Sequence, residues 1–330
     1  MKAATYTALL TVLPLLAGCS NATPMQQAIP QTESGASAGA TGDRFRSGSL
    51  TELFNLDYSN GSITVFSIQN GKATQSKKFT PAHGHAQGLA SDALGQIYTT
   101  STNSSSKPCV ACVLVFTETG TLVKQLDAPV LQGGSGPPSL TDISVDAHEN
   151  VYVSDYGQQA VYFFRHGLTK HSPTIVVQNS QNAASVAATP DGSTVLVSGG
   201  CGFASVRPYT RVAKGHYAAG NCFGIGTIAL IGGAADDQEE VLTPVDGAPG
   251  LVSVSSPTGG ATFHTPDQFH ASISGVALNG DASIAYVANH AKECVYAFAR
   301  PAGGWLSGTQ PKLLATYKGF KSLDIIAIPQ

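Results

Sequence analysis

The sequence predicts an all-β fold, a ring of small antiparallel sheets of the β-propeller class. Short apolar runs alternate with polar turns rich in Asp, Asn and Gly, which is the pattern of half-buried strands. The stretch Asp142–Phe164 contains three such runs separated by two turns, and similar stretches recur along the chain. The composition agrees, because only 12% of the residues are charged while Gly occurs 36 times.

One marker residue in the second apolar run of each repeat defines the repeat length. The markers are Phe54, Tyr98, Tyr152, Leu196, Val241 and Tyr286. Successive markers lie 44 or 45 residues apart, except for 54 residues between Tyr98 and Tyr152, where the loop around Cys109 is expected to be an insertion. A four-stranded propeller blade repeats at about 40–45 residues. Six markers therefore predict six blades, with seven as the alternative if the long spacing or the region 200–226 contains a weak repeat.

The two ends of the repeat region predict how the ring closes. The segment 50–79 matches the second, third and fourth strands of a repeat, and no first strand precedes it. The segment 322–330 matches a first strand and nothing more. Pairing between the N-terminal and C-terminal strands completes one blade and removes open sheet edges, which otherwise invite aggregation.

The first 48 residues are expected to lie outside the propeller. An apolar run leads into the tetrapeptide LAGC (16–19), which resembles the lipobox of bacterial lipoproteins. The resemblance implies a signal peptide over residues 1–18 and a lipid on the thiol of Cys19. Residues 19–48 are rich in Ser, Ala, Gly and Thr and are expected to be a flexible tether to a propeller domain over 49–330. An ordinary cleaved signal peptide is the alternative, and the apolar run is shorter than the ~20 residues of a membrane span.

The lipobox resemblance also implies a location and a membrane partner. Ser20 follows the cysteine where an Asp would resemble an inner-membrane retention signal, so we expect an outer-membrane or surface lipoprotein in an oxidising compartment. The net charge is −3 and no basic run occurs, which argues against nucleic acid as a partner. We expect a monomer that is held at the cell envelope by its lipid.

Five cysteines remain besides the lipidation candidate, and disulfides are expected in an exported protein. Cys201 and Cys222 bracket a Gly- and Tyr-rich excursion, and a disulfide between them is expected to staple a loop with little core of its own. Cys109 and Cys112 form a CxxC, for which we predict a local disulfide, with another pairing or a metal site as alternatives. Cys294 occupies the repeat position of Cys112 and is expected to be a buried thiol.

The repeat motif is h-A-h-D-x-x-G-x-h-Y-V, where h is an apolar residue, and it resembles the motif of NHL-repeat and related six-bladed propellers. The stretches GLASDALGQIYTT (88–100) and DISVDAHENVYVS (142–154) carry it. The resemblance covers residues 50–330 and implies the architecture. It implies no single activity, because the same scaffold carries lactonases, lyases, amidating enzymes and pure binding proteins.

Candidate site residues lie just before the first strands, where propellers of this kind open onto one mouth of the central channel. The candidates are His83, His85, Asp142 and His270. His83 and His270 hold equivalent positions in two blades. Imidazoles and a carboxylate together can bind a divalent metal or exchange protons near neutral pH; no cofactor is predicted, and a divalent metal stays an option. The alternative is that these polar residues cap turns in solvated loops.

Residues that follow the second strands have a simpler interpretation. Asp57, Asp155 and Asn289 are expected to bond to the backbone of their own turns, as Asp and Asn commonly do. Tyr58 and Tyr156 come directly after two of them and are expected to pack, with an aromatic rim for a ligand as the alternative. The acidic run 236–240 is expected to be a solvated turn.

Two functions are compatible with these features. The first is a lipid-anchored binding or interaction module for a protein, peptide or glycan, which the regular turns and weak charge favour. The second is an enzyme, a propeller lyase or lactone hydrolase with a His/Asp site at the channel mouth. Virginiamycin-type lyases resemble the second arrangement because they use His residues on a propeller face, but their fuller pattern does not occur in this sequence.

Overall fold

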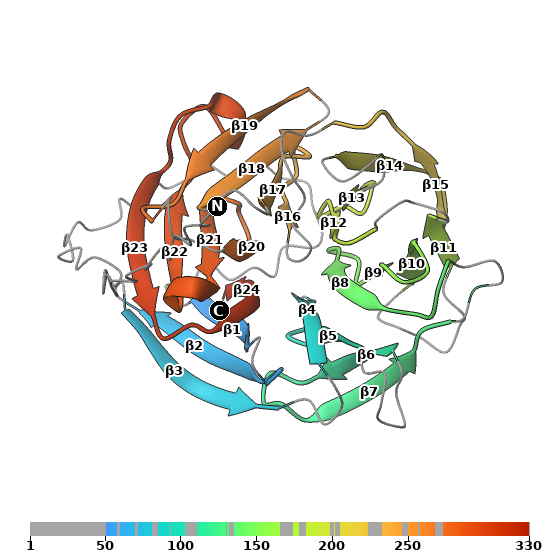
Figure 1. Ribbon diagram of the computed structural model, residues 1–330, viewed down its shortest axis with the longest axis horizontal. Coiled ribbons are helices and arrows are strands. Elements are labelled where there is room, and N and C mark those ends of the chain that lie inside the picture. The colour runs from blue at the N-terminus through green and yellow to red at the C-terminus, as the bar shows by residue number, and fades with distance from the viewer. Residues whose placement is uncertain are drawn as a thin grey trace, which may run out of the picture.

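The structure is a computed structural model that describes residues 51–329 with gaps. The gaps are 58–59, 70–71, 81–84, 93, 103–110, 130, 132–134, 166–173, 178–182, 199–200, 202–204, 224–232, 246–249, 257 and 268–272. The described residues form six four-stranded sheets in a ring, with almost no helix (Figure 1). The predicted six-bladed propeller is confirmed, and the seven-bladed alternative is wrong.

Each blade is an antiparallel sheet whose strands follow one another outward from the centre of the ring (Figure 1). Blade 1 contains β24 (Ser322–Pro329), β1 (Thr51–Asp57), β2 (Ile63–Gln69) and β3 (Lys72–Phe79). Blade 2 contains β4 (His85–Ser91), β5 (Ile97–Thr102), β6 (Ala111–Phe116) and β7 (Leu122–Asp127). Blade 3 contains β8 (Leu140–Val145), β9 (Val151–Asp155), β10 (Ala160–Phe164) and β11 (Thr174–Val177).

The other three blades repeat this order. Blade 4 contains β12 (Val186–Ala188), β13 (Thr194–Ser198), β14 (Val206–Ala213) and β15 (His216–Ala219). Blade 5 contains β16 (Ala234–Ala235), β17 (Val241–Pro244), β18 (Leu251–Ser256) and β19 (Gly259–His264). Blade 6 contains β20 (Ile273–Leu278), β21 (Ile284–Asn289), β22 (Cys294–Ala299) and β23 (Lys312–Lys318), with the short 3-10 helices η1 (His290–Lys292) and η2 (Trp305–Ser307) in its turns.

The ring closes as the two ends of the repeat region predict. Strand β24 is the innermost strand of blade 1 and pairs antiparallel with β1, with Phe54 opposite Ile326 and Leu53 opposite Ala327. All six marker residues lie in the second strands of their blades, which confirms the repeat register. The C-terminal strand thus completes the sheet that the N-terminal strands begin.

The apolar core lies in the seams between neighbouring blades. Each of six buried clusters combines side chains from two adjacent blades, for example Tyr98 of blade 2 with Tyr162 of blade 3. A single blade cannot bury both of its faces, so every blade depends on its neighbours for its core. Among the described residues the smallest cluster joins blades 4 and 5 through Ala187, Leu196, Val206 and Val241.

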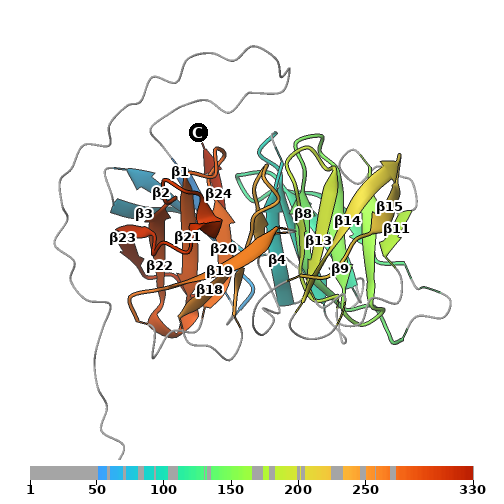
Figure 2. The ribbon, with the colours of Figure 1, turned by 90° about the horizontal axis from the view of Figure 1, so that it is seen from above.

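The strands run between two faces of the ring (Figure 2). We call one the connection face; it carries the blade-to-blade connections, such as 128–139, and the turns between second and third strands, such as 156–159. We call the other the hairpin face; it carries the turns between first and second strands, at 92–96, 146–150, 189–193, 236–240 and 279–283. Because sequential strands are antiparallel, Thr51 at the start of β1 lies on the hairpin face.

The five hairpin-face turns share one backbone geometry. In each turn one residue has positive φ: Gly95, Glu149, Gly192, Glu239 or Ala282. At Gly192 a Cβ would lie 2.1 Å from Asp146 Oδ2 of the neighbouring blade, so that position requires glycine. In three turns the first residue is an Asp whose Oδ1 accepts two backbone N–H groups of the same turn, as Asp146 accepts those of His148 and Asn150.

The region between Cys201 and Cys222 was expected to be a loop with little core of its own, and the structure differs from this expectation. It contains β14 and β15, the third and fourth strands of blade 4, and Tyr209 of β14 is buried in the seam with blade 3. The second half of β14 is exposed, so the strand shows little apolar alternation in the sequence. The disulfide therefore staples the outer half of a blade.

The acidic run 236–240 is only partly solvated, which corrects the expected turn. Asp236 and Glu240 are buried between blades 5 and 6, where Arg300 Nη2 lies 2.9 Å from Asp236 Oδ2 and 2.6 Å from Glu240 Oε2. Glu240 also accepts backbone N–H groups of Trp305 and Leu306 in η2. Burial, together with the neighbouring Glu240, raises the pKa of Asp236 to about 6.

Candidate interaction face

Most of the predicted mouth residues lie outside the part of the chain that the structure describes. His83 and His270 fall in the gaps, as do Tyr58 and Cys109, and Cys19 precedes the first described residue. His85 begins β4, where its backbone pairs with Thr102, but its side chain is not described. The histidine part of the predicted site therefore stays a prediction.

Asp142 is the mouth candidate that the structure does place, and it holds two blades together. Its side chain is buried, with 2% of the residue exposed. Its Oδ2 accepts the Ser185 hydroxyl at 2.5 Å and the Val186 N–H at 3.0 Å, so β8 of blade 3 is tied to the start of β12 of blade 4. Its Oδ1 accepts the N–H of Ile143 at 2.8 Å.

The same tie recurs where the ring closes. Asp324 is buried in β24, and its Oδ2 accepts the Leu89 N–H of blade 2 at 2.8 Å. Gly88 of blade 2 packs against the next inner strand instead, since a Cβ there would lie 2.7 Å from Asp142 Cα. Carboxylates that accept buried N–H and O–H groups are strong ties, so Asp142 and Asp324 stabilise the inner ring.

The exposed feature on the connection face is a patch of blade 3 that we call the Tyr156 patch; it comprises Tyr156 and the loop 135–139. The residue Tyr156 is 42% exposed, and Ser135 and Pro137 are exposed beside it. The loop is fastened to the turn, because Tyr156 N donates to Ser139 O at 2.9 Å and Ser135 Oγ donates to Gly157 O at 2.8 Å. A Cβ on Gly157 would lie 2.0 Å from Pro137 O, so this contact requires glycine.

A buried polar network fixes the patch from below. Asp155 Oδ1 accepts the N–H groups of Ser139 and Gln158, and Oδ2 accepts Gln158 Nε2 at 2.9 Å and Tyr162 Oη at 2.8 Å. Gln158 also donates to Pro129 O and accepts the Leu131 N–H. Asp155, Gln158 and Tyr162 are fully buried or nearly so. The expected turn role of Asp155 is confirmed, and the network also holds residues 129, 131 and 139 of the preceding connection.

The protonation state of this network is fixed by its burial. Burial, and then the nearby charge and hydrogen bond of Asp155, raise the pKa of Tyr162 far above its usual value. The phenol therefore keeps its proton and donates a hydrogen bond to Asp155 Oδ2. The patch above this network presents an aromatic ring, prolines, glycines and hydroxyl groups.

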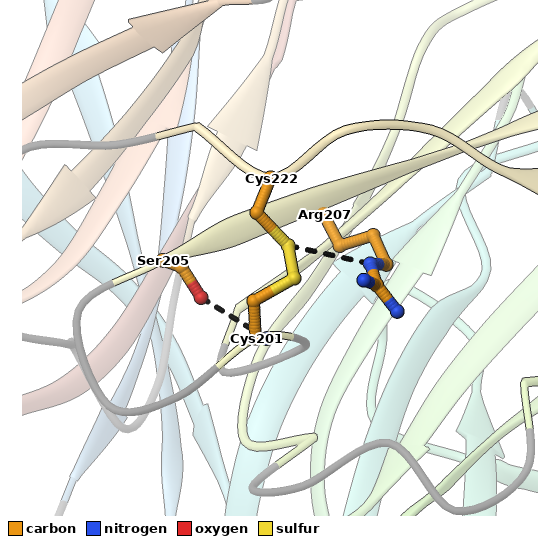
Figure 3. Close-up of a disulfide and its surroundings, with 4 residues drawn as sticks. All are labelled: Cys201, Ser205, Arg207 and Cys222. Atoms are coloured by element: carbon orange, nitrogen blue, oxygen red, sulfur yellow. Dashed lines mark hydrogen bonds between the residues drawn. A yellow bond between two sulfur atoms is a disulfide. The ribbon is translucent and has the colours of Figure 1, made fainter.

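The Cys201–Cys222 disulfide (Figure 3) lies on the same face, because Cys201 follows β13 and Cys222 follows β15. Cys201 is exposed in the turn after β13, and Cys222 is half-buried after β15. Arg207 Nε donates to Cys222 Sγ at 3.3 Å, and Cys201 N donates to Ser205 Oγ at 3.1 Å. The predicted pairing is confirmed.

The other cysteines agree with the predictions as far as the structure describes them. Cys112 takes part in a disulfide; the predicted partner Cys109 lies in a gap, so that pairing stays a prediction. Cys294 is a buried thiol outside any disulfide. Asn289 accepts the N–H of Lys292 at 3.2 Å and caps η1, which confirms its turn role.

Two features are absent from the described part of the chain. In that part of the chain no three His, Cys, Asp or Glu residues are grouped so that they could hold a metal ion. Within the same residues no helix is long and apolar enough to cross a membrane.

Comparison with known proteins gives the fold. No protein-family model and no curated protein sequence matches the chain. A chain from the crystal structure of a nidogen/laminin complex matches with a TM-score of 0.60 and 12% identity, over 84% of this chain and 98% of that chain. A streptogramin B lyase structure matches with a TM-score of 0.51 and 8% identity, over 82% of this chain and 75% of that one. At these identities the likeness shows the propeller fold alone.

A third solved structure extends the range of propellers that this chain resembles. It is a putative 6-phosphogluconolactonase from Bacteroides fragilis, with a TM-score of 0.51 and 14% identity, over 84% of this chain and 83% of that one. The neighbours thus include a protein complex, a lyase and a lactonase-like protein. An interaction module is compatible with this fold, as are the two enzyme classes.

Sequence reasoning missed the connection 129–139 as a site element. Its Gly and Pro content suggests an ordinary loop, and the anchoring residues lie 16 to 29 positions later in the chain. The sequence signal for this contact was the pair Asp155 and Gln158. The long amide side chain of a Gln three residues after a turn Asp can reach the backbone of a neighbouring loop, as Gln158 does. Tyr156 was identified by sequence, and the structure favours the surface interpretation over packing.

Proposed function

We propose that this protein is a lipid-anchored propeller of the bacterial cell envelope whose connection face binds a protein, peptide or glycan. Lipidation of Cys19 and the envelope location rest on the lipobox pattern. The binding role is supported by the fold and by the Tyr156 patch. It is also supported by the hydrogen bonds of Asp142 and Asp324, which tie the inner strands of different blades together. The proposed orientation is that β1 begins on the hairpin face, so the tether joins there and the connection face points away from it.

The observation that carries the binding role is the exposure of Tyr156 on a turn that buried hydrogen bonds hold in place. Tyr rings supply large contact areas at low entropic cost, and they are enriched at binding surfaces together with Ser and Gly. The Asp155–Gln158–Tyr162 network holds the turn and the loop 135–139 in place before any ligand arrives. Such preorganisation lowers the entropic cost of binding.

The binding proposal is tested with the full chain against a glycan array and a displayed-peptide library. Each ligand that is retained is then titrated against three proteins, namely wild type, Tyr156→Ala and Val212→Ala. Val212 is 67% exposed near the hairpin-face end of β14 and is the matched control. We expect Tyr156→Ala to weaken binding at least tenfold and Val212→Ala to leave it unchanged. Failure to retain any ligand, or equal affinity of the three proteins, would contradict the proposal.

The anchor is tested separately in bacterial cells. A radiolabelled fatty acid should enter the wild-type protein and should be absent from Cys19→Ser. The wild type should fractionate with membranes and Cys19→Ser with the soluble fraction. Membrane fractionation of both proteins without label would show that the signal is of another kind, and it would leave the binding face untouched.

The enzyme alternative would place a His/Asp site at the channel mouth. Asp142 would be its carboxylate, but both of its oxygens are engaged in buried hydrogen bonds to Ile143, Ser185 and Val186. A general base must reach the proton that it abstracts. The described contacts therefore favour the binding role.

A further inference from the structure

We infer that the Cys201–Cys222 disulfide is a thiol-exchange site, at which a thiolate attacks Cys201 and Cys222 leaves as a thiolate beside Arg207. This inference is independent of the ligand proposed above. It assigns a chemical role to a bond that sequence reasoning treats as a staple.

The two cysteine residues differ in exposure. Cys201 lies in an exposed turn after β13, whereas Cys222 lies half-buried between the end of β15 and the bridge residue Phe223. Thiol–disulfide exchange needs an approach to one sulfur while the other leaves, and access decides which sulfur is attacked. A thiol in solution, or on a protein, therefore meets Cys201 first.

The two sulfur atoms also differ in electrostatics. Arg207 Nε donates to Cys222 Sγ at 3.3 Å, which places a guanidinium cation beside this sulfur. A cation beside a sulfur stabilises the thiolate, and a thiol of lower pKa leaves faster. Accessibility and charge thus favour the same direction of reaction, with attack at Cys201 and departure of Cys222.

The step is balanced with a thiol as the reductant. A thiolate forms a new S–S bond to Cys201 Sγ as the Cys201–Cys222 bond breaks and its electron pair leaves on Cys222 Sγ. A second thiolate displaces Cys201 from the mixed disulfide. The protein disulfide is reduced to two thiols and the thiol reagent is oxidised to its disulfide. A small thiol of the glutathione class or the dithiol of a thiol oxidoreductase can supply both thiolates.

Backbone hydrogen bonds hold the outer strands of blade 4 together independently of the disulfide. Val206 and Phe223 form a two-way backbone bridge next to the disulfide, with Val206 N donating to Phe223 O at 2.6 Å and Phe223 N donating to Val206 O at 2.9 Å. Strands β14 and β15 also pair with each other through residues 209–219. Reduction therefore releases the turn at Cys201 while the outer strands of blade 4 stay paired.

The test uses the full chain and reduced glutathione at pH 7, with acid quenching and peptide mass spectrometry. We expect the mixed disulfide on Cys201. Arg207→Gln should slow reduction by about three- to tenfold, because the leaving thiolate loses its cation. The control is Arg211→Gln in the same strand, whose guanidinium lies by Asp191 O and should not affect the rate. An adduct on Cys222, or equal rates for wild type and Arg207→Gln, would overturn the inference.

A second measurement keeps the inference testable if Arg207→Gln folds poorly. Cys201→Ser leaves the Cys222 thiol beside Arg207, and Cys222→Ser leaves the Cys201 thiol in the open turn. Alkylation rates against pH, followed at the labelled peptide, should give a lower half-maximal pH for Cys222 than for Cys201. The reverse order would show that Arg207 does not favour departure of Cys222.

Discussion

Glu149, Glu239 and Ala282 are non-glycine residues in a backbone conformation that glycine occupies in two other blades. Their φ values are 60°, 60° and 54°. The left-handed conformation costs an L-residue roughly 1–2 kcal/mol because its Cβ crowds the following carbonyl. Glu239 offsets this cost, since its Oε1 accepts the Thr194 hydroxyl across the seam between blades 4 and 5 at 2.6 Å.

Glu149→Gly should therefore raise the free energy of unfolding by about 0.5–1 kcal/mol, because relief of strain exceeds the entropy gained by the unfolded chain. Glu239→Gly should not stabilise, because it also deletes the bond to Thr194. Gly192→Ala should destabilise by more than 1 kcal/mol, since its Cβ meets Asp146 Oδ2. Urea unfolding of the three variants checks this order. A loss of stability in Glu149→Gly would show that strain is not relieved there.

Asp236 is a buried carboxyl group that binds a proton more readily in the folded state than in the unfolded state. Its folded pKa is raised to about 6 from 3.8, first by burial. The folded state then binds more protons than the unfolded state between these two values, so stability from this group falls as the pH rises from about 4 to 6. The ion pair with Arg300 does not remove this effect, because Glu240 shares the same guanidinium.

Asp236→Asn should remove the loss of stability that Asp236 causes as the pH rises. Its free energy of unfolding relative to wild type should rise by roughly 1–3 kcal/mol from pH 4 to pH 7. Asp281→Asn is the control of opposite sign: burial opposes ionisation of Asp281, but hydrogen bonds from Ser283 and Asn279 outweigh it and lower its pKa. Denaturant unfolding at four pH values measures both differences. Parallel curves for wild type and Asp236→Asn would contradict the raised pKa.

At the scale of the element, the outer strands protect their open edges in three ways. Strands β11 and β15 have only four residues each. The edge of β19 is covered, because Gln310 accepts the His264 N–H and donates to the His264 carbonyl. The longer strands β3 and β23 carry lysines, at 72, 77, 78, 312 and 318. Short, covered and charged edges all resist edge-to-edge pairing.

Replacing Lys77 and Lys78 together by Val should therefore make the protein self-associate. The substitution creates an apolar segment on an open strand, while the packing of blade 1 is unchanged because both side chains are exposed. Light scattering after size-exclusion chromatography should show dimers or larger species at micromolar concentration. The Lys77→Arg, Lys78→Arg double variant keeps the charge and should elute as wild type. A monomeric valine variant would show that charge does not guard this edge.

For the whole molecule, the number of blades and their closure were predictable from sequence because one blade is one repeat. Marker residues such as Tyr98 and Tyr152 are buried at equivalent places, so their spacing counts the sheets. The degenerate repeat around Val241 was also placed correctly, since burial preserved its second strand. These features depend on local periodicity, which a single sequence displays.

The contacts between blades could not be predicted in the same way. Asp142 is a channel-mouth candidate from the sequence, and its Oδ2 accepts hydrogen bonds from residues 43 and 44 positions later, on the next blade. Asp236 was expected in solvent, and its partner Arg300 belongs to the following blade. Strand β14 was hidden because its exposed end breaks the alternation. The contacts of Asp142 and Asp236 cross seams between blades, which periodicity does not encode.

Hydrogen–deuterium exchange of the full chain, resolved by peptide, tests the closed ring most directly. Strand β24 pairs with β1 from Leu53–Ala327 to Leu56–Asp324, and Asp324 ties it to blade 2. The amides of 322–329 should therefore exchange only by the opening that also exposes β1, with protection equal to that of 51–57. Rapid exchange of 322–329 while 51–57 stays protected would show a ring that is not closed by its C-terminal strand.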